Sequence, residues 1–231
     1  IDEAAEVMKE LARSGRKILF VATKKQAKDI IAEKAASVNM PYVTERWPGG
    51  MLTNFPTIRK AIKKMNTIDK MKEDGTYDKL AKRERLQIDR QRAKLEKNLG
   101  SIKDMSRLPS ALFVVDIQKE ANAVKEANRL NIPVIAMVDT CCDPNPIDYV
   151  IPANDDATKS IEYITNALCE AIQEGLNERK LEKEKEAPAE AAEKPAAKKL
   201  RPRKAAKADE AAEEAPKAEA PVEAAAEENA E

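Results

Sequence analysis

Histidine is absent from this 231-residue chain, and aromatic residues make up only 3% of it. The missing histidine removes the commonest general base and the commonest nitrogen ligand of metal ions. The sequence also has neither a nucleophile elbow nor a phosphate loop that ends in Gly-Lys-Ser or Gly-Lys-Thr. We therefore expect a binding protein that is not an enzyme and that uses no metal and no cofactor.

Cysteine and long apolar runs are scarce as well. Three cysteines, two of them adjacent at Cys141 and Cys142, match neither a disulfide framework nor the spacing of a metal site. The adjacent pair lacks the two-residue spacer of a thioredoxin-like motif, so we expect it to be inert. No apolar run exceeds five residues, whereas a membrane helix needs about 20. These absences predict a protein of the reducing cytoplasm with no membrane contact and no small-molecule substrate.

The charges cancel over the whole chain, with 41 basic and 41 acidic residues, but they are unevenly distributed. Residues 55–107 hold 16 Lys and Arg against 8 Asp and Glu, while residues 179–231 hold 12 against 14. The two remaining pieces together hold 13 basic and 19 acidic residues. Because Lys and Arg neutralise phosphates, residues 55–107 are the candidate nucleic-acid surface. The acidic pieces would face proteins, since like charge repels phosphate.

Short apolar runs alternate with amphipathic segments in residues 1–54 and 108–178. We expect strands at about 16–22, 42–44, 111–115, 134–138 and 149–151, and helices at about 23–39, 119–130 and 155–177. Thr23 is expected to cap the first of these helices, and Asp155 and Asp156 the last. This alternation predicts an α/β domain in which a parallel sheet carries helices on both faces. The opening residues already have the pattern of a mid-helix segment, so we expect that an N-terminal piece is missing.

Residues 55–107 interrupt this alternation. A narrow apolar seam with steps of three and four runs through residues 58–68 and again through residues 88–102, on either side of a turn signal at Asp74-Gly75-Thr76. Such a seam predicts an inserted α-helical coiled-coil hairpin. Residues 179–231 are almost entirely Ala, Glu, Lys and Pro, which predicts a disordered C-terminal tail.

The candidate RNA-binding residues are cations of the hairpin, of the loop before it, and of the corner where the first strand meets its helix. That corner faces ligands in open α/β sheets and offers free backbone N–H groups to phosphate. The alternative is that these side chains are solvated surface. The candidates are Lys24, Lys25, Arg46, Arg59, Lys60, Lys63, Lys64, Arg83, Arg85, Arg90, Arg92, Lys94 and Lys97.

A junction loop precedes the hairpin and holds the single tryptophan of the chain. Its key residues are Trp47, Gly49, Gly50 and Asn54. The glycines permit positive φ, and Trp47 offers a face on which an RNA base could stack. Alternatively, Trp47 fills the gap between sheet and hairpin. We expect it to be buried, because Pro48 fixes the loop and apolar residues at 51, 52 and 55 surround it.

A rival hypothesis is a metal-dependent α/β enzyme that uses aspartates at the edge of the sheet. The aspartates in question fall near strand ends or helix starts, where enzymes of this class place catalytic groups. Helix capping and turn formation explain the same positions without any chemistry. The aspartates are Asp116, Asp139, Asp143, Asp155 and Asp156.

Four stretches carry a resemblance to a known family. They are Phe-Val-Ala-Thr-Lys-Lys-Gln-Ala at 20–27, Arg-Trp-Pro-Gly-Gly-Met-Leu-Thr-Asn at 46–54, Leu-Glu-Lys-Asn-Leu-Gly-Ser-Ile at 95–102, and the series from Asn131-Ile-Pro to Ser160-Ile161. In this order and spacing the chain resembles the second protein of the small ribosomal subunit in its bacterial form. Cys141 departs from the asparagine usual there, and the family's histidine-bearing N-terminal segment is missing.

The resemblance implies a flavodoxin-like α/β domain with an inserted coiled-coil hairpin and no catalytic activity. It further implies that the protein is ribosome-bound in the cytoplasm and contacts small-subunit ribosomal RNA and neighbouring ribosomal proteins at the neck between head and body. There the family is associated with recruiting the large mRNA-binding protein of the small subunit.

Overall fold

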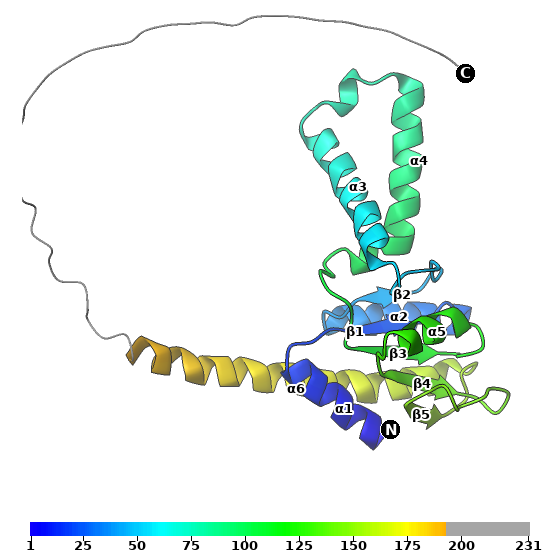
Figure 1. Cartoon of the computed structure of the whole chain (residues 1–231), viewed down its shortest axis with the longest axis vertical. Helices are drawn as coiled ribbons and strands as arrows, with labels where there is room; N and C mark the ends of the chain where they lie inside the picture. The colour runs from blue at the N-terminus through cyan, green and yellow to red at the C-terminus, as the bar shows by residue number, and fades with distance from the viewer. Residues whose placement is uncertain (193–231) are drawn as a thin grey trace, which may run out of the picture. The chain divides into compact units, whose positions relative to one another are not determined.

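The computed structural model describes residues 1–192, and for residues 183–192 only the backbone. A five-stranded parallel sheet has the order β2-β1-β3-β4-β5, which is the flavodoxin-like order (Figure 1). The predicted α/β fold is therefore confirmed. Its strands are β1 (Ile18–Val21), β2 (Tyr42–Val43), β3 (Ala111–Val115), β4 (Val134–Val138) and β5 (Tyr149–Pro152).

Three helices cover one face of the sheet. They are α1 (Asp2–Arg13), α2 (Lys25–Ser37) and α6 (Thr158–Ala192). Their small and apolar side chains pack on alternate residues of the central strands, with Phe20 and Phe113 in edge-to-face contact. β1, β3 and β4 are buried along their whole length, because both faces are covered.

The opposite face is covered differently. Among the described residues, the short helix α5 (Ala121–Arg129), the junction loop and the base of the hairpin together form the apolar layer on it. Ile102 and Met51 are fully buried there. The hairpin thus shares one hydrophobic core with the sheet, which positions it firmly at its base.

The hairpin consists of α3 (Phe55–Glu73), a 3₁₀ turn η1 (Tyr77–Lys79) and α4 (Lys82–Leu99), and it ends in a second 3₁₀ turn η2 (Gly100–Ile102). Figure 1 shows α3 and α4 extending from the sheet. Gly75 has φ +69°, which a glycine adopts without strain at the predicted turn. The Tyr77 hydroxyl donates to Asp89, and Lys72 lies 2.7 Å from the same carboxylate, so polar contacts hold the tip.

Two predicted helix caps are wrong. Thr23 does not cap α2, because its hydroxyl donates instead to Glu120. Before α6, the side-chain oxygen of Asn154 accepts hydrogen bonds from two following backbone N–H groups, while Asp155 and Asp156 pair with Lys24. In each case the side chain that the local sequence predicted as a helix cap interacts instead with a residue far away in the chain.

Helix α6 also passes its expected end near residue 177 and continues to Ala192. The added turns are rich in Ala, Glu and Lys, which are strong helix formers, and ion pairs tie part of them to α1. Arg13 pairs with Glu182, and Lys9 pairs with Glu174 and Glu178. Helix α6 therefore includes residues 179–192 of the predicted tail, and the rest of the predicted tail, 193–231, lies outside the described residues.

Candidate nucleic-acid interface

The hairpin cations that the sequence analysis predicted to bind RNA fall into two groups. One group forms ion pairs with carboxylates of the hairpin or its base: Arg85 with Asp78, Arg92 with Asp69 and Glu96, and Lys97 with Glu45. For the other group, no carboxylate oxygen of the described residues lies within 4.0 Å of the charged nitrogens. This unpaired group, exposed to solvent, comprises Arg59, Lys60, Lys63, Lys64, Arg83, Arg90 and Lys94.

Arg92 braces the two helices of the hairpin. Its guanidinium on α4 donates a hydrogen bond to Asp69 on α3. This contact lowers the pKa of Asp69 and raises the pKa of Arg92, because each charged form is stabilised by the other. Lys28 and Lys97 likewise lower the pKa of Glu45 at the base. Arg92 and Lys97 therefore have structural partners that the sequence did not reveal.

At the strand-helix corner, Lys24 is paired with carboxylates of the protein itself. The ammonium of Lys24 lies 2.8 Å from Asp155, 2.6 Å from Asp156 and 3.3 Å from Asp116, and the side chain is only 14% exposed. Burial alone would lower the pKa of Lys24, but the hydrogen bonds from its ammonium to Asp155 and Asp156 raise it. Lys24 is thus a charged internal clamp, whereas its neighbour Lys25 is exposed.

The contacts of Lys24 argue against the rival hypothesis of a metal-dependent enzyme site at the sheet edge. Oxygens of Asp139, Asp155 and Asp156 lie within 4.8 Å of one another, as metal ligands would. However, Lys24 already supplies the positive charge to Asp155 and Asp156. Asp116 accepts from the N–H groups of residues 118 and 119, and Asp143 from that of residue 145, so both serve as the expected turn residues.

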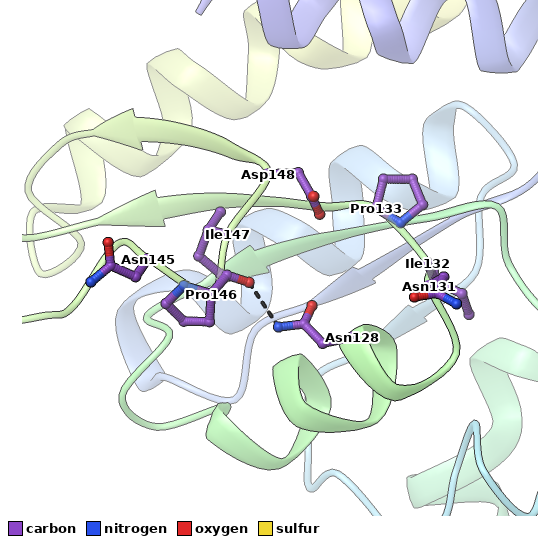
Figure 2. Close-up of a pocket in the computed structure, with 8 residues that line it drawn as sticks. All are labelled: Asn128, Asn131, Ile132, Pro133, Asn145, Pro146, Ile147 and Asp148. Atoms are coloured by element: carbon purple, nitrogen blue, oxygen red, sulfur yellow. Dashed lines mark hydrogen bonds between the residues drawn. The ribbon is translucent and has the colours of Figure 1, made fainter.

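A polar cavity of about 390 Å³ lies at the other end of the sheet (Figure 2). There the Asn128 amide donates to the Pro146 carbonyl at 2.9 Å, and Asp148 accepts from the N–H of Val134 at 2.8 Å. Because β4 begins at Val134, this hollow is separated from the aspartates that follow the strands. Its walls are built from Asn128, Asn131, Ile132, Pro133, Asn145, Pro146, Ile147 and Asp148.

The junction loop closes on one carboxylate that the sequence analysis missed. Glu126 of α5 accepts hydrogen bonds from the Trp47 indole at 3.1 Å and from the backbone N–H groups of Gly50, Leu52 and Thr53 at 2.7–3.1 Å. Partial burial would raise the pKa of Glu126, but these four donors outweigh it and lower the pKa. No local pattern distinguishes Glu126 from the solvated glutamates of other helices.

Trp47 is buried, with 7% of its surface exposed, as expected from its apolar neighbours. Gly50 has φ +79°, which favours glycine at this position, while no atom of the described residues lies within 4 Å of the Cβ position of Gly49. Asn54 precedes α3 and accepts a hydrogen bond from the Thr57 hydroxyl at 2.8 Å. Arg46 is exposed beside the buried Trp47, so charge and packing are divided between adjacent residues.

Comparison with known proteins agrees with this architecture. The family model for ribosomal protein S2 matches residues 1–175. The chain is 74% identical over 193 residues to small ribosomal subunit protein uS2 of Parabacteroides distasonis, covering 84% of this chain and 68% of the relative. It is 70% identical over 200 residues to the uS2 protein of Phocaeicola vulgatus, covering 86% and 72%.

A further relative, the uS2 protein of Flavobacterium johnsoniae, is 70% identical over 191 residues, covering 83% of this chain and 75% of the relative. Among the described residues, no helix is both long enough and apolar enough to cross a membrane. Both the family model and the relatives are of a ribosomal, non-enzymatic class. The chain belongs to the ribosomal protein S2 family.

Proposed function

We propose that this protein binds small-subunit ribosomal RNA through the unpaired cations of the α3–α4 hairpin and works as a structural constituent of the small subunit on cytoplasmic bacterial ribosomes. The observation that carries this proposal is that seven of the predicted RNA-binding cations of the hairpin are exposed and have no carboxylate partner in the described chain. Their charge is available to phosphates, and displaced counterions would drive binding.

Contacts within the hairpin and at its base also fix the position of these charges. The ion pair between Asp69 and Arg92 joins its helices, and the Ser101 hydroxyl donates to the Tyr42 carbonyl of β2. The junction loop, fixed by Glu126, packs under its base. Such a preorganised arm loses less conformational freedom on binding than a mobile one.

The sheet portion suits protein partners better than RNA. Outside the hairpin and residues 179–231 the chain holds 13 basic and 19 acidic residues, and phosphate is repelled by such an excess. We propose that the protein sits at the neck between head and body. There its acidic surface would face neighbouring ribosomal proteins and help recruit the large mRNA-binding one.

Charge reversal tests the RNA-binding proposal. Lys63, Lys64, Arg90 and Lys94 are changed together to Glu, and binding is measured by co-sedimentation with small subunits stripped of their own S2-family protein. A matched control reverses four exposed cations elsewhere, Lys125, Arg129, Lys159 and Lys180. We expect the hairpin variant to lose binding at physiological salt and the control to retain it, and equal retention by both would refute the proposal.

A further inference from the structure

A basic cavity lies at the base of the hairpin. Its volume is about 220 Å³, and its wall is formed by α3 on one side and by residues 103–106, which follow η2, on the other. Arg59, Lys63 and Lys103 contribute three cations, and Ser106 contributes a hydroxyl. Asp104 is the one carboxylate residue in the wall, so positive charge prevails.

The three cations lack carboxylate partners within 4.0 Å among the described residues. Arg59 and Lys63 stand four residues apart on α3, which places them on the same helix face. Lys103 is brought opposite them because the preceding Ile102 is fully buried and Ser101 is bonded to β2. Two segments about 40 residues apart in the chain therefore converge their charges on one concave surface.

Asn66 gives this cavity a second chemical character. It lies three residues beyond Lys63 and also lines the wall. Its side-chain oxygen is screened from solvent and accepts no hydrogen bond from the described residues. A screened acceptor without a donor costs stability, and a rotation of the Asn66 side chain towards the cavity would let a ligand hydroxyl remove that cost. The cavity therefore suits a ligand that combines an anion with a neutral hydroxyl donor.

We infer that this cavity binds one ribose-phosphate unit of ribosomal RNA, with the phosphate between Arg59, Lys63 and Lys103 and the 2′-hydroxyl donating to Asn66. The inference rests on the proposed function and names the contact that distinguishes RNA from DNA, because only RNA carries the 2′-hydroxyl. The volume is below the range of about 300–1,000 Å³ typical of sites for drug-sized ligands, which fits a backbone unit.

The charge side of the inference is tested with two matched triple variants. One changes Arg59, Lys63 and Lys103 to Gln, and the other changes Lys60, Lys64 and Lys94 to Gln. Each removes three unpaired hairpin cations, and each is assayed on the stripped small subunits. We expect the cavity variant to bind about tenfold more weakly than the control variant, since it loses a converged phosphate site. Equal losses would overturn the inference and leave the proposed function standing, whereas failure of the unaltered chain to bind would overturn both.

The hydroxyl side is tested with Asn66→Leu and with the ribosomal RNA fragment that cross-links to the hairpin in the stripped subunits. The fragment is made as RNA and as 2′-O-methyl RNA, which keeps the phosphates and removes the donor. The unaltered chain and a Thr67→Val control should prefer the RNA several-fold, and Asn66→Leu, with a melting temperature no lower than that of the unaltered chain, should bind both equally. Equal binding by the unaltered chain, or a preference retained by Asn66→Leu, would overturn the role of Asn66.

Discussion

The sheet edge and the hairpin are both rich in charge, but they use it in opposite ways. At the sheet edge the ammonium of Lys24 forms ion pairs with three aspartates of the protein, so its charge is not available to an external ligand. On the hairpin, seven of the predicted RNA-binding cations have no such partner in the described chain. Counting charges along the sequence therefore finds the basic segment, but ion pairing decides which of its cations remain available.

The junction loop links these two regions, and truncation of its buried tryptophan should have the largest effect on the free energy of unfolding. We expect Trp47→Ala to lower the free energy of unfolding by about 3–5 kcal/mol, in the range of large core truncations. Urea denaturation measures the loss. The single indole reports its own environment, so strong quenching by iodide in the free protein would contradict the burial of Trp47.

The Lys24 clamp should matter for folding and not for RNA. Lys24→Met leaves three carboxylates close together without their cation, and we expect a loss of about 3 kcal/mol in unfolding free energy. The exposed hairpin residue Lys64, changed to Met, should alter stability by less than about 0.5 kcal/mol. Denaturant unfolding of the two variants compares the regions directly, and equal stabilities would show that the clamp is not formed.

Glu126 offers a pH test of the junction. Glu126→Gln replaces one acceptor oxygen by an amide NH₂ and leaves some of the groups that donate to Glu126 without a partner, which should cost about 2 kcal/mol at pH 7. Because folding lowers the pKa of Glu126 from its ordinary value of 4.5, its contribution is present above pH 4.5 and is lost as pH falls through the folded-state pKa.

The difference between Glu126→Gln and the parent chain should therefore shrink in acid. Unfolding measured from pH 7 downward checks this, with exposed Glu162→Gln as the control that shows no such trend. A stability difference that stays constant from pH 7 to well below pH 4.5 would show that the carboxylate charge of Glu126 is not what holds the loop.

The smallest effect is expected for the ion pairs between α1 and α6. Lys9 contacts Glu174 and Glu178 at 3.0 Å, but all three side chains are open to solvent, which screens the attraction. Lys9→Gln should leave the urea midpoint nearly unchanged. A marked shift would mean that α6 is held to α1 by charge more than by its buried apolar residues.

The fold follows from local sequence, and the site only in part. The runs at 111–115 and 134–138 are fully buried strands at the predicted bounds, because a short run of five apolar residues fits a strand that is covered on both faces. Contacts between residues far apart in the chain could not be predicted from the sequence. Thr23 meets Glu120 97 residues away, and Lys24 meets Asp155 131 residues away. Pairwise contacts of this kind, which also include Trp47 with Glu126, leave no periodic signal.

Lysine acetylation footprinting of the free protein and of the assembled small subunit tests the contrast most directly, because one experiment reads both regions. Lys60, Lys63, Lys64 and Lys94 should react in the free protein and become protected in the subunit. Lys24 should remain unreactive in both, because its ammonium is buried among aspartates. Hairpin lysines that stay reactive in the assembled subunit would contradict the proposal that this arm binds ribosomal RNA.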